Sequence, residues 1–300
     1  MDQNIQDKNQ VIVLSGPTAS GKTALAGKLI EHFPLEIISA DSRQVYKGLD
    51  IGTGKDTTIP QHMLDVVNPG ESFSVDQYRK MAERIMEDIW KRRKIPLVVG
   101  GSGYYIEALL YQRTANQTAP RPELRAKLER LSAVEALAEL KTKDPATAAH
   151  LDPHNRRRIL RALEIVIVTN KPREPLQRAL KPNLETSWYV LDVPRADLYH
   201  AIDQRVDDRL RGGMVKEVQG LLEYKVFPEW LLKLGLEYRF VTLYLQGKIS
   251  YDEMVPRLKY AIHAYSRRQQ TFFRRWPEAE WADASTITSQ VAQILKDHHV

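Results

Sequence analysis

The stretch VIVLSGPTASGKTALAGKL, residues 11–29, decides the fold. Its central part, GPTASGKT, fits the phosphate-binding pattern G-x-x-x-x-G-K-[ST] at every fixed position. An apolar run at 10–15 predicts a strand before this loop, and an amphipathic stretch at 22–33 predicts a helix after it. In that context backbone N–H groups and the helix N-terminus bind phosphate. The pattern predicts a phosphate-binding loop made of Gly16, Pro17, Thr18, Ala19, Ser20, Gly21, Lys22 and Thr23.

Strands and helices continue to alternate up to about residue 113. LEIISA (35–40) and IPLVVGG (95–101) are predicted buried strands, and residues 72–94 between them predict a helix. Ser74 and Gln77 have the spacing of a capping box at the start of that helix. This alternation is typical of a parallel sheet covered by helices, so we predict an open α/β fold.

The pattern changes after residue 113, and the chain to about residue 185 has helical composition with no clear strand. TSWYVLDV (186–193) predicts another strand, and the rest is expected to be helical. We therefore predict a P-loop kinase-like core in two parts, 1–113 and 186–300, with an inserted all-helical domain at 114–185.

Composition limits the classes of function. The 300 residues include no cysteine, which excludes disulfides, thiolate zinc sites and a cysteine nucleophile. The polar N-terminus does not have the form of a signal peptide, and no apolar run approaches the roughly 20 residues of a membrane span. We expect a cytoplasmic protein with no membrane association.

Basic residues are concentrated in two segments. The net charge is +6, and RLKYAIHAYSRRQQTFFRRW (257–276) contains no acidic residue. HNRRRILR (154–161) is the second cluster. Either cluster could be a solvated face, but arginines interleaved with aromatic residues favour nucleic acid, since rings stack on bases and guanidinium groups bind phosphates.

Asp41 lies at the carboxyl end of the strand at 35–40, where α/β sheets bind ligands. It could instead cap a turn with Ser42. A motor or switch NTPase would place a Mg²⁺-binding acid after a later strand, but the strand at 95–101 ends in glycines followed by Ser102. This difference argues against that class of ATPase.

Several segments together closely resemble the tRNA dimethylallyltransferase family: GPTASGKT, DSRQVYKGLDIGTGK, VVGGSGYY, DP…HNRRRILRALE and YSRRQQTFFRRW. They occur in the family's order, from about residue 11 to 276. The resemblance implies transfer of a dimethylallyl group from dimethylallyl diphosphate to the exocyclic N6 of an adenosine beside the anticodon. The loop would then hold the donor's diphosphate, with Mg²⁺ at Thr23, and Asp41 would be the general base.

The resemblance also implies other contacts. Ser102, where many members have threonine, and Arg205 would join the diphosphate site, although Arg205 could instead form a surface ion pair with a neighbouring aspartate. The inserted domain would clamp the anticodon arm of the tRNA, and we expect the protein to act as a monomer. The residues implied to bind tRNA are Asp41, Ser42, Arg43, Gln44, His154, Asn155, Arg156, Arg157, Arg158, Gly235, Arg239, Arg267, Arg268, Gln269, Thr271, Phe272 and Arg274. Arg267 and Phe272 replace the family's usual lysine and tryptophan.

Three other classes remain as alternatives. A small-molecule or nucleoside kinase using ATP explains the loop and Asp41 but gives the basic clusters no role. An RNA-binding ATPase explains the basic clusters but predicts a Mg²⁺-binding acid that the sequence lacks. A metal hydrolase is the weakest, because the histidines lack an H-x-x-E-H-like spacing and only His298–His299 are adjacent.

Overall fold

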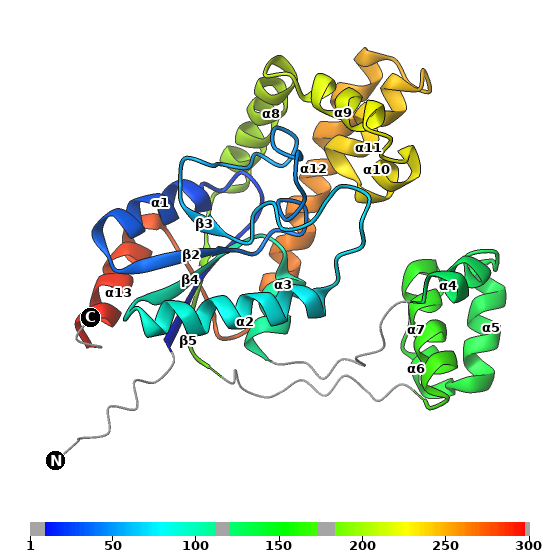
Figure 1. The fold of residues 1–300 in the computed structure, drawn as a ribbon, viewed down its shortest axis with the longest axis horizontal. Coiled ribbons are helices and arrows are strands. Elements are labelled where there is room, and N and C mark those ends of the chain that lie inside the picture. Colours follow the sequence, from blue (N-terminus) through cyan, green and yellow to red (C-terminus); the bar gives the residue numbers. More distant parts are fainter. Residues whose placement is uncertain (1–9, 112–120, 173–183, 298–300) are drawn as a thin grey trace. The chain divides into compact units, whose positions relative to one another are not determined.

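The computed structural model describes residues 10–111, 121–172 and 184–297. The chain divides into two compact units: residues 1–110 with 182–300, called the sheet unit below, and residues 111–181, called the helical unit. Figure 1 shows the strands in the first unit and helices α4 to α7 in the second. The predicted domain boundaries lie within a few residues of this division.

The sheet unit is built on six parallel strands in the order β3-β2-β4-β1-β5-β6. The central strand β1 pairs Val13 with Val98 of β4 on one side and with Trp188 of β5 on the other. The strands are β1 (Gln10–Ser15), β2 (Leu35–Ser39), β3 (Gln61–His62), β4 (Ile95–Gly100), β5 (Glu185–Leu191) and β6 (Ala279–Ala282).

The predicted parallel α/β fold is therefore confirmed, with two strands added. β3 has two residues and β6 has four, so both are too short for their alternation to stand out in the sequence. The expectation that the chain after residue 193 is wholly helical was wrong, because β6 pairs with β5 at the edge of the sheet.

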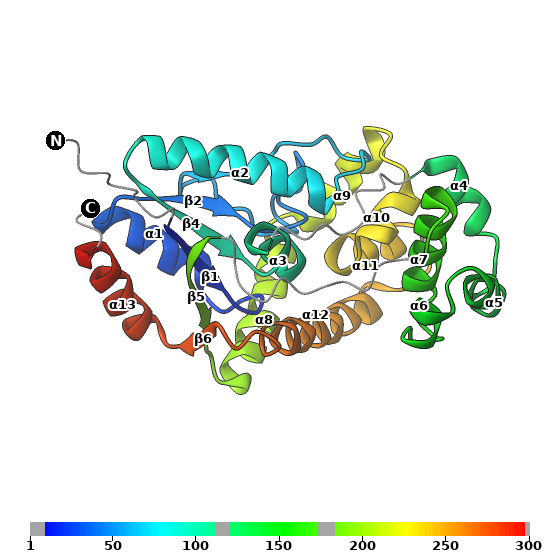
Figure 2. The ribbon, with the colours of Figure 1, turned by 90° about the horizontal axis from the view of Figure 1, so that it is seen from below.

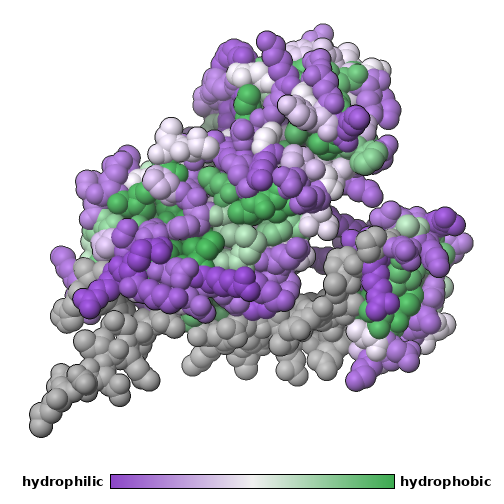
Figure 3. All heavy atoms as spheres, in the orientation of Figure 1, coloured by the Kyte–Doolittle hydropathy of each residue, from purple (hydrophilic) through white to green (hydrophobic). Residues whose placement is uncertain are grey.

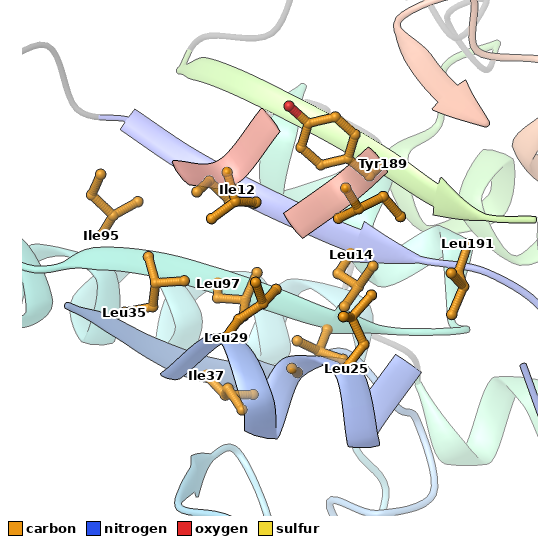
Figure 4. Close-up of a cluster of buried hydrophobic side chains, with 14 of the residues drawn as sticks. Ile12, Leu14, Leu25, Leu29, Leu35, Ile37, Ile95, Leu97, Tyr189 and Leu191 are labelled. Carbon is orange, nitrogen blue, oxygen red and sulfur yellow. The ribbon is translucent and has the colours of Figure 1, made fainter. Parts of the chain in front are cut away.

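Helices cover both faces of the sheet (Figure 2). On one face, α1 (Lys22–His32) and α13 (Ala284–Asp297) pack on alternate strand residues, including Ile12, Leu14 and Leu97 (Figure 4). On the other, α2 (Val75–Lys91) buries Tyr78, with the predicted capping box of Ser74 and Gln77 at its start. Each fully buried aliphatic side chain contributes about 1.5–3 kcal/mol, so this double layer fixes the carboxyl ends of β1, β2 and β4.

The remaining helices of the sheet unit follow β4 and β5. They are α3 (Gly103–Leu110), α8 (Arg195–Arg211), α9 (Met214–Glu223), α10 (Pro228–Leu234), α11 (Leu236–Leu245) and α12 (Tyr251–Phe273). The long helix α12 contacts α3, α8 and α11. Polar and charged residues prevail on the face drawn in Figure 3.

The helical unit has its own hydrophobic core. It consists of α4 (Pro122–Leu128), α5 (Ala133–Lys143), α6 (Pro145–Ala149) and α7 (Arg156–Thr169), which bury Leu140, Ile159 and Leu163 between them. The described residues of this unit contain no strand, as predicted. His298–His299 lie outside the described residues. Within the described ranges, no helix has the length and apolar character to cross a membrane.

Candidate active site

A cavity of about 320 Å³ lies in the sheet unit, where β2 and β4 end. The phosphate-binding loop and helices α8, α11 and α12 supply its walls. Distant parts of the sequence therefore meet at the sheet edge where α/β folds bind ligands. The predicted site residues that line the cavity are Thr18, Ala19, Ser20, Gly21, Lys22, Thr23, Asp41, Arg43, Gln44, Arg205 and Gln269.

The loop before α1 has the curled backbone that phosphate binding requires. Ala19 and Gly21 have φ of 62° and 89°, and α1 begins at Lys22. The Lys22 ammonium donates to the Pro17 carbonyl oxygen at 2.6 Å and to Ser20 Oγ at 3.3 Å. Burial, together with the nearby positive charge of Arg205, lowers the pKa of Lys22 to about 7, against the opposing effect of Asp41. This cation is therefore buried without a counter-ion strong enough to offset its burial.

Asp41 both caps a turn and lines the cavity. Its Oδ1 accepts the backbone N–H of Arg43 at 2.8 Å and that of Gln44 at 3.4 Å. The described residues donate no hydrogen bond to its other oxygen, Oδ2. Ser102 does not line the cavity; its Oγ instead accepts the N–H of Ser42 at 3.0 Å and so holds the turn that carries Asp41.

Four cationic side chains of the described residues line the cavity: Lys22, Arg43, Arg205 and Arg209. Arg43 and Arg209 share Glu237, at 3.0 and 2.7 Å. Across the described residues, neither Lys22 nor Arg205 forms an ion pair with a carboxylate. The two cations that remain uncompensated therefore face the same cavity, as a site for a multiply charged anion requires.

The alternative role of Arg205, a surface ion pair with a neighbouring aspartate, is wrong. Asp203 lies beside His263, Asp207 beside Lys259 and Asp208 beside Arg211. Arg205 instead donates to the Thr53 carbonyl oxygen at 3.3 Å. Burial, with the charge of Arg209, lowers the pKa of Arg205 to about 10, against the opposing effect of Glu237 and Asp41.

The segment DIGTGK, residues 50–55, forms the wall beside these arginines. The Glu217 carboxylate accepts the backbone N–H groups of Asp50, Ile51 and Gly52 at 2.9, 2.5 and 3.1 Å. Gly54 has φ of 63°, a conformation that favours glycine, and a Cβ there would displace the guanidinium groups of Arg205 and Arg209, which would lie 2.1 and 2.2 Å from it.

On α12, Gln269 is buried and bonded within the protein. Its amide oxygen accepts the Thr18 N–H at 2.9 Å, and its amide nitrogen donates to the Gly101 carbonyl oxygen at 2.9 Å. A Cβ on Gly101 would lie 2.2 Å from that nitrogen, which explains a glycine here. Gln269, predicted to bind tRNA, thus joins the phosphate-binding loop to the loop after β4.

This chain is similar in sequence to a family of known proteins. A family model described as IPP transferase matches residues 44–276. The chain is 42% identical to the tRNA dimethylallyltransferase of Roseiflexus sp. (strain RS-1), over 95% of the chain and 97% of the relative. The chain belongs to the IPP transferase family. It is also 40% identical to the tRNA dimethylallyltransferase of Thermomicrobium roseum, over 93% of the chain and 87% of that protein.

Solved structures of IPP transferases share the fold. The full-length tRNA isopentenylpyrophosphate transferase of Bacillus halodurans superposes with a TM-score of 0.72 at 30% identity, over 97% of this chain and 98% of that one. A eukaryotic dimethylallyltransferase acting on tRNA gives 0.74 at 26% identity, over 92% and 74%. The predicted P-loop kinase-like fold and the predicted family are both confirmed.

The other predicted tRNA contacts in the sheet unit lie mainly on exposed surface. Arg267, Arg268 and Thr271 of α12 and Arg274, directly after it, are exposed, whereas the half-buried Phe272 packs on Tyr104 with ring centroids 5.1 Å apart. Gly235, with φ of 84°, joins α10 to α11, and the exposed Arg239 follows it.

The predicted tRNA contacts of the helical unit lie at the start of α7. Asn155 caps this helix by accepting the Arg158 N–H at 3.2 Å, and Arg156 donates to the carbonyl oxygen of Leu131 at 2.9 Å. His154, Arg157 and Arg158 are exposed. This end of α7 therefore presents a basic surface.

Sequence reasoning missed Arg209, Glu217 and Glu237. Arg209 and Glu217 are ordinary charged residues on helices, and nothing near them in the sequence indicates their partners. Glu237 carried a weak signal, because an acidic residue stands between Gly235 and Arg239, which are both implied to bind tRNA.

Proposed function

We propose that the protein transfers a dimethylallyl group from dimethylallyl diphosphate to the exocyclic N6 of an adenosine beside the anticodon of tRNA. Family membership supports this assignment, since its named relatives are tRNA dimethylallyltransferases. The observation that carries it is the combination in one cavity of two unpaired cations, Lys22 and Arg205, with the carboxylate of Asp41. The cations suit a diphosphate leaving group, and the carboxylate suits a general base.

The reaction balances with these groups. N6 of the adenine attacks C1 of the donor, so the N6–C1 bond forms as the bond between C1 and the diphosphate oxygen breaks. The electron pair of the broken bond leaves with the diphosphate, and one N6 proton passes to Asp41. The amine is a poor nucleophile because its lone pair is delocalised into the ring, so a positioned base contributes about 10²–10⁴-fold.

Negative charge accumulates on the diphosphate as it departs. Lys22, Arg205 and the N–H groups of the loop would stabilise that charge, and a single preorganised donor of this kind is worth about 10²–10³-fold. The Thr18 N–H already donates to Gln269, so it holds the loop's shape instead.

Mg²⁺ fits the residues present. The described residues contain no group of three histidine, cysteine or acidic side chains that could hold a metal, but Thr23 lines the cavity beside Lys22. Mg²⁺ is commonly held by one or two protein oxygens together with substrate phosphates and water. Thr23 would supply the hydroxyl oxygen, and the ion would neutralise charge on the leaving diphosphate.

The exposed arginines of α7 and α12 would bind the tRNA backbone, and the target adenine would leave its stack to reach Asp41. We further propose that the helical unit grips the anticodon arm, and that the protein acts as a cytoplasmic monomer. The rival function, an ATP-dependent kinase, fits the loop but leaves these arginines without a role, and the named relatives do not favour it.

Two matched incubations test the proposal. One contains the protein, Mg²⁺, unmodified tRNA and labelled dimethylallyl diphosphate; the other contains labelled ATP in place of the prenyl donor. The proposal expects label in tRNA only in the first incubation. Consumption of ATP with no label in tRNA would establish the kinase instead.

A further inference from the structure

Glu237 lies at the start of α11 and is buried between two arginines of the cavity. Its carboxylate is 5% exposed and pairs with Arg43 at 3.0 Å and Arg209 at 2.7 Å, each of them at most 17% exposed. The residue before it, Leu236, has φ of 45°, a conformation that a leucine rarely adopts. A strained conformation persists only where the surrounding structure enforces it, and the residue that follows Leu236, Glu237, lines the cavity.

Arg43 belongs to the same turn as Asp41. Its backbone N–H donates to Asp41 Oδ1 at 2.8 Å, so its side chain starts beside that carboxylate. The guanidinium instead lies over the Tyr265 ring, 5.6 Å from its centroid, and bonds to Glu237. Burial alone would lower the pKa of Arg43, but the charges of Glu237, Tyr265 and Asp41 raise it, so this side chain stays cationic.

We propose that Glu237 is a positioning residue that holds Arg43 away from Asp41, leaving that carboxylate available to accept the proton of the adenine amine. The inference rests on the proposed function, in which Asp41 is the general base. Arg209 also pairs with Glu237, but its guanidinium donates a second hydrogen bond to the Gly52 carbonyl oxygen at 2.8 Å, which holds it against the wall formed by residues 50–55.

The charges around both carboxylates give the direction of the effect. Lys22, Arg43 and Arg205 act on Asp41 electrostatically, together with the phenols of Tyr105 and Tyr265. Glu237 is influenced by Arg43, Arg205 and Arg209 and by Tyr238 and Tyr265. Removing its charge would release Arg43 to pair with Asp41, and a carboxylate paired with a guanidinium is a weaker base that protonates at lower pH.

The test is the pH profile of a single turnover at saturating donor and tRNA. Glu237→Gln keeps the shape of the side chain but removes its charge. We expect the plateau rate to fall by about tenfold and the acidic limb to move to lower pH by about one unit, with tRNA affinity retained. Adding Arg43→Gln to Glu237→Gln removes the released cation, so the limb should return to its wild-type position.

Glu217→Gln is the matched control. Glu217 also holds backbone N–H groups of the cavity wall, but it pairs with none of the four cations. We expect this variant to lower the melting temperature without moving the acidic limb. The inference is overturned if the acidic limb of Glu237→Gln lies at the wild-type pH. It is also overturned if adding Arg43→Gln does not return a shifted limb to the wild-type position.

If Glu237→Gln alone does not fold, the double variant with Arg43→Gln decides the question. A double variant that folds and matches Arg43→Gln alone supports the inference, whereas a double variant that also fails to fold shows that Glu237 serves the fold instead. Absence of transfer by the wild-type protein would contradict the proposed function itself. If the wild type transfers the group but the Glu237 variants do not behave as expected, only this inference fails.

Discussion

Each of the two units buries one carboxylate between two arginines, yet the surroundings differ. In the helical unit, Glu164 is 1% exposed, while its partners Arg125 and Arg161 are 45% and 33% exposed. In the sheet unit, Glu237 and both of its partners are buried beside a cavity. The first arrangement presents its cations to water, and the second directs them within a binding site.

The difference indicates that a buried carboxylate between two arginines serves a different purpose in each unit. Glu164 of α7 also accepts the Arg121 N–H at 3.0 Å, so it fixes the start of α4 against α7. Buried ion pairs add little net stability but cost much when one partner is removed. We therefore assign Glu164 to the shape of the helical unit and Glu237 to the charge of the cavity.

The largest of these effects is expected for the part of the cavity that carries Lys22 and Arg205, the two cations with no carboxylate partner among the described residues. Lys22→Met removes the cation that faces the diphosphate, and we predict that transfer falls by about 10³-fold and that the donor binds more weakly. Rapid-quench assays would measure the rate and equilibrium dialysis the donor affinity. tRNA affinity serves as the control, and a variant that binds the donor as tightly as the wild type would remove Lys22 from the diphosphate site.

The pH dependence of binding tests the same cation. The pKa of Lys22 is about 7 in the free protein, and a bound diphosphate would raise it, so the cation predominates in the free protein below pH 7 and is lost as the pH rises above 7. We predict that the ratio of wild-type to Lys22→Met affinity for inorganic diphosphate, in metal-free buffer, falls by about 30-fold between pH 6 and about 8.5.

The comparison with Lys22→Met isolates this effect, because titration of the diphosphate itself affects both proteins equally. The ratio of wild-type to variant affinity should fall as the pH rises. A ratio that stays constant over this range would mean that Lys22 does not titrate there.

Glu164→Gln tests the other side of the comparison. The neutral amide removes the charge with which Arg125 and Arg161 pair, and we predict a loss of about 1.5 kcal/mol in the unfolding free energy, since both arginines reach solvent. Urea denaturation of the full chain followed by circular dichroism would measure it. The single-turnover rate at saturating tRNA should not change; a shifted pH profile would erase the distinction from Glu237.

The smallest effect is expected on the exposed face of α12. Arg268→Gln should weaken tRNA binding by about threefold and reduce the slope of log affinity against log salt by about one. Filter binding across salt concentrations measures both, with the transfer rate at saturating tRNA as control. An unchanged salt slope would show that Arg268 makes no phosphate contact.

Local patterns account for what the sequence could predict. The phosphate-binding loop and the strand that ends at Asp41 are each contained in a short segment, so both were predictable. The pairing of Arg43 and Arg209 with Glu237 joins positions far apart in the chain, and no local spacing indicates it.

The burial of Gln269, in contrast, could have been predicted from the sequence. The buried residues of α12 include Ile262, Ser266, Gln269 and Phe273, which follow helical spacing. That period places Gln269 on the inner face, whereas the neighbouring Arg267 and Arg268 point outward. The charge of the segment suggested one tRNA-binding surface, although only its outer face is exposed.

The most direct test of the account is single-turnover transfer from labelled dimethylallyl diphosphate to unmodified tRNA by the wild type and by Asp41→Ala, with both binding constants measured alongside. The account predicts that the chemical step falls by about 10²–10⁴-fold while donor and tRNA bind almost as before. A variant that loses tRNA binding but transfers at the wild-type rate once saturated would contradict the assignment of Asp41 as the general base.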